Sequence, residues 1–174
     1  MPLRSREQQE FWVEPLARTH DRSVFSCGIA ALDRYLRQQA GQDAARQVSV
    51  CFILTPNGRT VAGFYTLSQY AVDLAGLTAE LASKLPKYPE VPATLLGRLA
   101  VGIEFKGRGL GEFLLLDALH RCWKHSNEIA SLAVVVDAKD EAAVRFYRHF
   151  NFISLPGTPS RLFLPMKTLE KLFV

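Results

Sequence analysis

Three glycines within five residues separate a strand-like segment from a helix-like one. The segment Lys106–Gly111 reads KGRGLG. Glycine lets the backbone turn sharply and approach a ligand closely, and the first N–H groups of a helix lack intrahelical partners and carry partial positive charge. This combination predicts an anion site suited to a pyrophosphate, to which two basic side chains add formal charge. The candidate ligand contacts are Lys106, Gly107, Arg108, Gly109, Leu110 and Gly111.

Three interpretations of this turn compete. A Walker A loop requires GxxxxGK[ST], and the Lys-Ser/Thr pair is absent. A dinucleotide fingerprint requires GxGxxG, but here the third glycine comes one residue early. The next apolar segment does end at an acid, Asp137, as that fingerprint requires, yet the 37 residues that follow do not supply further βαβ units. A glycine corner that binds no ligand remains open as the third interpretation.

Other chemistries find little support among the residues. None of the four histidines forms an HxxxH pair or a Cys/His cluster, so we expect no metal site. No GxSxG elbow and no adjacent Cys-His pair indicates covalent catalysis. Glu104 lies near the turn, but we interpret it as a solvated loop acid, and no carboxylate or histidine stands out as a general base.

The elements that must position the turn alternate between β-rich runs and helical periodicity, which indicates an α/β or α+β fold. A hairpin is expected at Pro56–Gly58, and Asp140 is a plausible helix N-cap. We expect strands at Phe11–Ala17, Val48–Thr55, Thr60–Val72, Thr94–Val101, Ser131–Val136 and Arg161–Pro165. We expect helices at Cys27–Arg46, Leu77–Lys84, Leu110–His125, Glu141–Phe150 and Lys167–Phe173.

Length and composition narrow the class of protein. The chain has 174 residues, of which 48% are apolar, and its mean hydropathy is +0.04. One domain covering residues 1–174 is expected. No apolar run is long enough to cross a bilayer. The polar N-terminus and three distant cysteines favour the reducing cytoplasm over secretion. The net charge of +4 permits a polyanionic partner such as nucleic acid.

Three separated motifs resemble those of the GNAT superfamily of acetyl-CoA-dependent N-acetyltransferases: LGRLAV, then KGRGLG, then FYRHFNF. The family motif is Gln/Arg-x-x-Gly-x-Gly/Ala, so Lys106 departs mildly from its first position. Asn151 stands where the family typically has glycine, and asparagine is the next best residue for a left-handed helix cap. The resemblance implies an α+β, α/β-layered GNAT fold, with a mixed, mostly antiparallel central sheet and helices on both faces.

Longer segments between Phe25 and Leu169 are similar to the TacT/AtaT-type toxins of that superfamily. They include FSCGIAALDRYLRQQA and PKYPEVPATLLGRLAV. This resemblance implies an enzyme that uses acetyl-CoA to acetylate the α-amine of aminoacyl-tRNA and so blocks translation. It also implies a homodimer neutralised by a ribbon-helix-helix antitoxin.

The same resemblance assigns roles to individual residues. The strand end Leu99, Ala100 and Val101 would splay, bind the pantetheine through its backbone and polarise the acetyl carbonyl. Tyr147 would donate a proton to the departing thiolate, since a phenol with a pKa near 10 is protonated at neutral pH. Without the motif, the sequence favours a structural role for Tyr147, as a half-buried helical tyrosine whose hydroxyl caps a carbonyl; the motif match reverses this preference. Asp137 and Phe146 complete the candidate acetyl-CoA contacts, although Phe146 also fits simple packing.

Basic residues on flanking segments are candidate contacts for tRNA phosphates. Arg98 lies within LGRLAV, where an exposed loop charge is not expected, and could instead pair with an internal acid. The other candidates, each of which taken alone is better interpreted as a solvated surface charge, are Arg46, Lys84, Lys87, Arg145 and Arg148. The absence of a strong base favours an α-amine acceptor over lysine, because an α-amine is partly deprotonated near neutral pH.

Two alternative functions remain open from the sequence. An enzyme of the same class could acetylate a small-molecule amine, a peptide N-terminus or a protein lysine. A protein of a different class could use the GNAT fold to bind acetyl-CoA or a partner without turnover.

Overall fold

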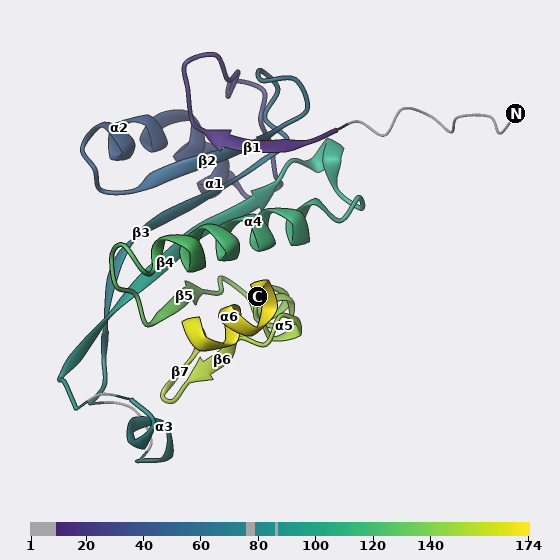
Figure 1. The fold of residues 1–174 in the computed structure, drawn as a ribbon. Helices are drawn as coiled ribbons and strands as arrows, with labels where there is room; N and C mark the ends of the chain where they lie inside the picture. Colours follow the sequence, from purple (N-terminus) through teal and green to yellow (C-terminus); the bar gives the residue numbers. More distant parts are fainter. Residues whose placement is uncertain (1–9, 76–78, 86) are drawn as a thin grey trace, which may run out of the picture. The chain divides into compact units, whose positions relative to one another are not determined.

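The apolar runs of the sequence form strands in the computed structural model, which describes residues 10–75, 79–85 and 87–174. In this part of the chain the strands make a seven-stranded sheet in the order β1-β2-β3-β4-β5-β7-β6 (Figure 1). Their bounds are β1 Trp12–Pro15, β2 Val50–Thr55, β3 Gly63–Asp73, β4 Glu90–Val101, β5 Ala133–Asp137, β6 Ile153–Leu155 and β7 Thr158–Pro165.

The strand pairing is mixed and mostly antiparallel, as predicted. β1 runs antiparallel to β2, and β7 runs antiparallel to both β5 and β6. β4 and β5 are parallel, with Thr94–Leu96 opposite Val134–Val136. The predicted strands differ from the observed ones by one to four residues at one end or both. β4 begins at Glu90 instead of Thr94, and the short strand β6 was not predicted.

Each predicted helix has an observed counterpart among the described residues, but the bounds differ at most of them and the 3-10 turn Ile103–Phe105 was not predicted. α4 has the predicted bounds, whereas the helix predicted from Cys27 begins only at Ala30 and contains a π-helical turn. Residues 77 and 78 of the predicted Leu77–Lys84 helix lie outside the described residues. The bounds are α1 Ala30–Arg34, the π-turn η1 Tyr35–Gln39, α2 Ala40–Ala45, α3 Ala79–Ser83, the 3-10 turn η2 Ile103–Phe105, α4 Leu110–His125, α5 Glu141–His149 and α6 Met166–Phe173.

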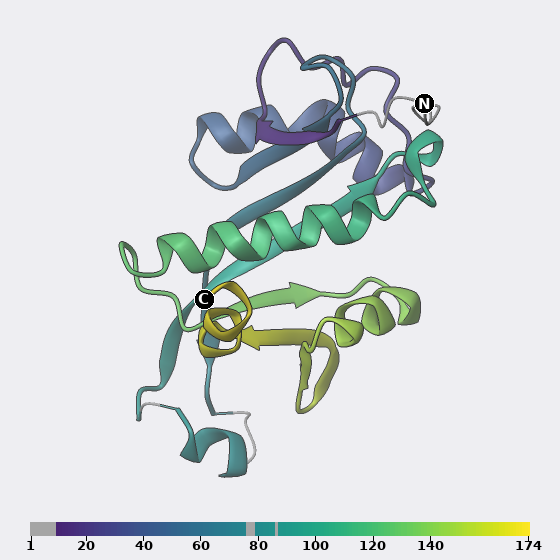
Figure 2. The same cartoon turned by 45° about the vertical axis from the view of Figure 1, so that its right-hand side comes forward.

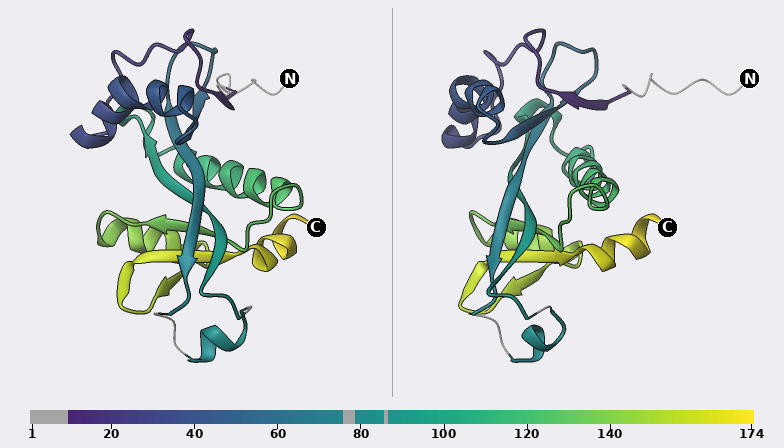
Figure 3. Two further views of the ribbon diagram at one scale, coloured as in Figure 1. Left: turned by 90° about the vertical axis from the view of Figure 1, so that its left-hand side faces the viewer. Right: turned by 60° about the vertical axis from the view of Figure 1, so that its left-hand side comes forward.

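The chain divides into two compact units. The first comprises residues 1–65 and 98–114, and the second comprises residues 66–97 and 115–174. β3, β4 and α4 each contribute residues to both units, and β3 and β4 are neighbours in the sheet (Figure 3). The glycine turn belongs to the first unit and Tyr147 to the second.

The first unit is held by an apolar core between its helical segment and its strands, with α2 against β2. Phe64 lies at the centre of the aromatic part of this core, because its ring contacts both Phe25 and Tyr35. The buried cluster consists of Phe25, Cys27, Tyr35, Leu36, Ala40, Cys51, Ile53, Val61, Phe64 and Ala100.

The second unit buries β5 from Ala133 to Val136, and only its last residue, Asp137, is exposed. Val134, Val135 and Val136 have no exposed surface, as predicted for a strand covered on both faces. Leu162 and Leu164 of β7 are also buried, and α5 and α6 both pack against β7 (Figure 2). No helix in the described ranges is long and apolar enough to cross a membrane.

Candidate active site

The glycine turn adopts the backbone conformation that makes glycine necessary. Gly107 and Gly109 have φ values of +79° and +74°, in the left-handed region that other residues avoid. A Cβ at either position would meet no atom within 4 Å, so their faces are open for a ligand to approach. α4 begins immediately afterwards at Leu110, and the Phe113 N–H donates to the Gly109 carbonyl at 3.1 Å. The turn therefore directs the unpaired N–H groups of a helix start outward.

Lys106 fixes this turn to a second tight turn of the first unit. Its Nζ donates to the Cys27 carbonyl at 3.0 Å, next to Gly28, whose φ is +89°. The Cys27 N–H in turn donates to the buried carboxylate of Asp33 at 2.8 Å. The lysine at the first motif position thus has a structural partner, while the Arg108 guanidinium lies 5.6 Å from the centre of the Phe105 ring.

The end of β4 approaches β3 very closely. A Cβ at Gly63 would lie 2.7 Å from the Ala100 carbonyl oxygen, so only glycine fits opposite this residue. Just past the strand, the Gly102 N–H donates to the Ala62 carbonyl at 2.7 Å. Ala100 is buried, whereas Leu99 and Val101 are half-buried.

The ladder between β4 and β5 stops before β4 does. Its paired residues end at Leu96 and Val136, although β4 continues to Val101. Leu99–Val101 lies beyond the stretch paired with β5, and its main-chain groups on that side can serve a ligand.

Tyr147 combines burial with a hydroxyl that has no protein partner. The residue is 8% exposed, and burial raises the pKa of its phenol above the ordinary value. Its ring contacts Phe146 and Phe152 edge to face, at centroid distances of 5.2 and 5.3 Å. Among the described residues its hydroxyl makes no hydrogen bond, so it does not cap a carbonyl. A neutral phenol held in this way can donate a proton to a group that comes within reach.

The helix that carries Tyr147 is capped at both ends as its sequence predicts. The Asp140 carboxylate accepts from the Ala143 N–H at 2.8 Å, which confirms the predicted N-cap. At the other end Asn151 has a φ of +70°, which confirms the left-handed conformation expected of it. The Phe152 N–H then donates back to the Tyr147 carbonyl at 3.2 Å.

Asp137 and Phe146 both have protein partners. The Asp137 carboxylate receives two hydrogen bonds from the Arg161 guanidinium, at 2.7 and 3.1 Å. Arg161 also donates to the Tyr70 hydroxyl. Phe146 is half-buried between the rings of Tyr147 and Phe150. Both residues therefore have a structural role whether or not they contact acetyl-CoA.

Arg98 stacks on an aromatic ring and does not pair with an internal acid. Its guanidinium carbon lies 3.5 Å from the centroid of the Tyr35 ring. Tyr35 donates to the Asp43 carboxylate at 3.1 Å, and burial raises the pKa of the Tyr35 phenol. Within the described residues Arg98 forms no ion pair, so its charge is available to an outside anion.

The remaining basic candidates divide between a cavity and the open surface. Arg145 and Arg148 line one cavity of about 450 Å³ at the start of α5. Arg148 donates to Ser154 at 2.9 Å, and Arg145 lies 3.9 Å from Glu141 on an exposed face. Arg46, Lys84 and Lys87 are exposed.

The first unit also contains a basic cavity, and no metal-binding cluster occurs in the described residues. In the part of the chain described here, no three His, Cys, Asp or Glu residues lie close enough together to hold a metal ion. A cavity that the sequence analysis missed is lined by Arg18, Arg22, Arg37 and Arg59. Their spacing has no period, and the only signal was the two arginines within the loop RTHDRS.

The first unit thus carries an open glycine turn at a helix start and a strand end beyond its ladder, and the second unit carries a buried tyrosine. The family model of the acetyltransferase (GNAT) family matches residues 10–152. The chain therefore belongs to the acetyltransferase (GNAT) family, as the sequence motifs predicted.

Within this family, the chain is similar to proteins whose substrate or bound partner is named. The chain is 39% identical over 152 residues to the tRNA-acetylating toxin of Mycobacterium tuberculosis, covering 87% of this chain and 90% of that protein. It is similar to the crystal structure of a tyrosine-to-phenylalanine mutant of KacT, with 28% identity, a TM-score of 0.87 and coverage of 94% and 99%. It is equally similar to AtaT complexed with acetyl-methionyl-tRNAfMet, with 30% identity, a TM-score of 0.87 and coverage of 95% and 100%.

Proposed function

We propose that this protein transfers the acetyl group of acetyl-CoA to the α-amine of an amino acid esterified to tRNA, and thereby stops translation. The observation that carries the proposal is the glycine turn, whose two left-handed residues are open to a ligand at the start of α4. Such a turn suits a diphosphate, and a diphosphate is the group by which a coenzyme A donor can be held.

The donor is held by main-chain groups in this proposal. The N–H groups of Gly107–Gly111 bind the diphosphate, and Arg108 adds charge. The free main-chain groups of Leu99–Val101 bind the pantetheine and orient the thioester carbonyl, so that a backbone N–H polarises it. A related structure supports acetyl-CoA as the donor: AtaTR bound with AcCoA is 31% identical, with a TM-score of 0.84 and coverage of 94% of this chain and 98% of that one.

Tyr147 acts as the general acid. The acceptor nitrogen forms a bond to the acetyl carbon while the carbon–sulfur bond breaks, and the Tyr147 hydroxyl gives its proton to the thiolate. The proton that the amine loses passes to solvent, which returns one to the phenolate. The raised pKa keeps Tyr147 protonated before each turnover.

Aminoacyl-tRNA is the acceptor that agrees best with the basic residues of this chain and with the substrates named for similar proteins. An α-amine is partly deprotonated near neutral pH and needs no strong base. The tRNA-acetylating relative and the AtaT complex with acetyl-methionyl-tRNAfMet support the same acceptor class. Arg98, free of ion pairs in the described structure, and the exposed basic residues at 46, 84, 87, 145 and 148 are the proposed phosphate contacts.

The cellular role follows from this acceptor. The protein acts in the cytoplasm as a homodimeric toxin, and a ribbon-helix-helix antitoxin neutralises it. An AtaT mutant bound to the C-terminus of the antitoxin AtaR, 29% identical to this chain with a TM-score of 0.82, supports the antitoxin part.

Transfer of labelled acetyl groups tests the function. Acetyl-CoA is incubated with the protein and, in parallel, with aminoacyl-tRNA, uncharged tRNA, free amino acids and lysine peptides. We expect label only on aminoacyl-tRNA. Label on lysine peptides or free amino acids would contradict the acceptor, and binding of acetyl-CoA without transfer to any amine would contradict catalysis.

A further inference from the structure

Four arginines converge on a cavity of about 670 Å³ in the first unit. We call Arg18, Arg22, Arg37 and Arg59 the arginine pocket. None of them belongs to the glycine turn or to the basic candidates discussed above. The cavity has a single carboxylate, Asp21, and its other lining residues are two hydroxyl side chains and one histidine.

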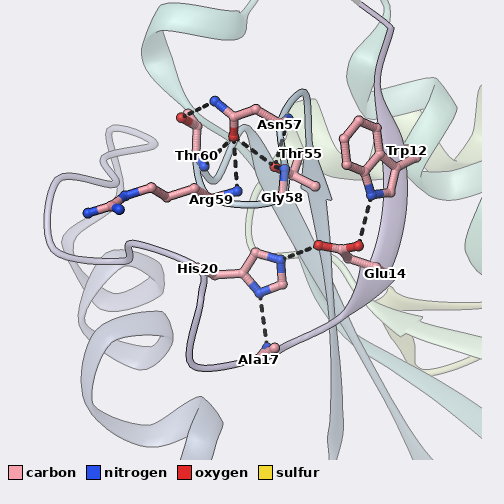
Figure 4. A network of polar contacts seen from close by, with 9 residues as sticks. All are labelled: Trp12, Glu14, Ala17, His20, Thr55, Asn57, Gly58, Arg59 and Thr60. Atoms are coloured by element: carbon pink, nitrogen blue, oxygen red, sulfur yellow. Dashed lines mark hydrogen bonds and ion pairs between the residues drawn. The ribbon is translucent and has the colours of Figure 1, made fainter.

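A buried histidine holds the loop that carries Arg18 and Arg22. The His20 side chain is completely buried, and its Nδ1 accepts from the Ala17 N–H at 2.9 Å. Because Nδ1 accepts, Nε2 carries the proton and donates to the Glu14 carboxylate at 2.7 Å (Figure 4). The loop is therefore folded around His20 before any ligand arrives.

A second turn presents Arg59 to the same cavity. The Asn57 side-chain oxygen accepts from the N–H groups of Arg59 and Thr60 at 2.9 and 2.8 Å (Figure 4). The Asp21 N–H donates to the Arg59 carbonyl at 2.8 Å, which joins this turn to the histidine loop.

Two of the four guanidiniums are fixed by main-chain carbonyls. Arg22 donates to Leu36 at 3.0 Å, and Arg37, on the π-turn η1, donates to Phe25 at 2.9 Å. A guanidinium has five N–H donors, so one bond leaves the others for a ligand. Arg18 and Arg59 make no side-chain hydrogen bond or ion pair with any described residue. The Asp21 carboxylate accepts from the Ser23 N–H and hydroxyl. It makes no direct contact that would neutralise Arg18 or Arg59.

The chemistry of the walls selects the ligand. Guanidiniums bind phosphate in a bidentate way, and four in a preformed frame suit a repeating phosphate chain. No aliphatic side chain lines the cavity, so it offers no apolar pocket that would anchor a peptide. Its one ring, that of His20, is completely buried and cannot stack on an unpaired base. We propose that the arginine pocket binds backbone phosphates of a double-helical stem of the RNA substrate. This inference rests on the proposed function.

Duplex binding tests the pocket directly. An uncharged 12-base-pair RNA hairpin labelled with a fluorophore is titrated with wild type, with Arg18→Ala/Arg59→Ala, and with Arg34→Ala/Lys124→Ala, which removes two exposed charges elsewhere. We expect the pocket variant to bind at least about tenfold more weakly at 0.1 M salt. Its slope of log affinity against log salt should fall by about 2, since each phosphate contact contributes about 0.9. Arg18→Lys/Arg59→Lys should keep the slope and lose part of the affinity.

Arg18 and Arg59 support no part of the described fold through their side chains, so circular dichroism and melting should match wild type. Equal weakening in the Arg34→Ala/Lys124→Ala variant would overturn the proposal, as would unchanged duplex affinity. A pocket variant that loses binding to polyglutamate but not to the hairpin would show that the ligand is an acidic peptide. The hairpin carries no amino acid, so its binding tests only whether the arginine pocket holds a double-helical stem. Acetyl transfer to aminoacyl-tRNA by wild type tests the proposed function separately.

Discussion

The ring of Tyr147 has a structural role, whereas its hydroxyl oxygen is available for a catalytic one. Its ring packs between Phe146 and Phe152, so the ring supports the helix, while its hydroxyl contacts no described protein group. The residue as a whole is only 8% exposed, and a hydroxyl on such a side chain usually has a protein partner. The arrangement is understandable if a ligand completes the site.

Replacing Tyr147 by Phe removes only that hydroxyl. We expect acetyl-CoA affinity and melting temperature to stay near wild type, because packing is retained, while kcat falls by about 10²- to 10⁴-fold, the usual contribution of a general acid. Isothermal titration and single-turnover kinetics measure both. Tyr88→Phe, which removes an exposed phenol, is the control. An unchanged kcat in the Tyr147 variant would assign the proton to another group.

Residue types predicted some of the site better than others. Asn151 and Asp140 were predicted correctly because their conformations depend on local chain geometry, which sequence spacing describes. The bond from Lys106 to the Cys27 carbonyl was not predictable, since it joins positions far apart in the chain. The arginine pocket was missed for the same reason: Arg18, Arg37 and Arg59 meet only through the tertiary fold.

The predicted bounds of an element were correct where a glycine turn and helical periodicity indicated the same residue. α4 has the predicted bounds because an apolar face and a preceding glycine turn mark its start. The helix predicted from Cys27 was too long because Gly28 is left-handed and Ile29 is extended, which excludes both from the helix. The π-turn η1 leaves no periodic signal, and β6 is too short, at three residues, to show alternation.

The glycine turn yields a prediction that separates backbone strain from ligand approach. At a φ of +74°, Gly109→Ala should cost about 1–2 kcal/mol of unfolding free energy, because L residues avoid this region. Gly109→Asn should cost less, since asparagine tolerates it. Both should weaken acetyl-CoA binding, because either Cβ occupies the open face where the ligand approaches. Denaturant melts and titration calorimetry provide the measurements, and wild-type affinity in both variants would argue against the turn as the diphosphate site.

Glu14 of β1, which binds His20 of the following loop, should make stability depend on acid pH. Hydrogen bonds from Trp12 and then from His20 lower the pKa of the Glu14 carboxyl. A carboxyl with a lowered pKa in the folded state stabilises the fold above its unfolded pKa, about 4.3, and loses this effect as pH falls through the folded pKa. Wild type should thus lose more melting temperature below about pH 4.3 than Glu14→Gln does, whereas the exposed-site control Glu170→Gln should follow wild type. Parallel curves for wild type and Glu14→Gln would refute this.

For the whole molecule, we propose that residues 1–174 form one domain although they divide into two compact units. β3, β4 and α4 each pass from one unit to the other, so a separation of the two units would interrupt all three elements. We therefore expect one calorimetric unfolding transition whose enthalpy equals the van't Hoff value. Two resolved transitions, or protease-resistant fragments ending near residues 65 or 97, would indicate two domains.

The family and the mixed sheet could be predicted from the sequence because three motifs occur in the right order, and each depends on short-range geometry. Which acceptor the site uses depends on charges brought together from distant segments. For the acceptor, the similar proteins are therefore stronger evidence than the spacing of motifs. We therefore claim above all that the acceptor is the α-amine of aminoacyl-tRNA.

Mass spectrometry of total tRNA, incubated with the protein and acetyl-CoA and then digested to its aminoacyl-adenosines, tests that claim most directly. We predict an added acetyl group on the α-nitrogen of one or a few amino acids, present with wild type and strongly reduced with Tyr147→Phe. Aminoacyl-adenosines that stay unmodified, while acetyl-CoA is consumed on another amine, would contradict the account.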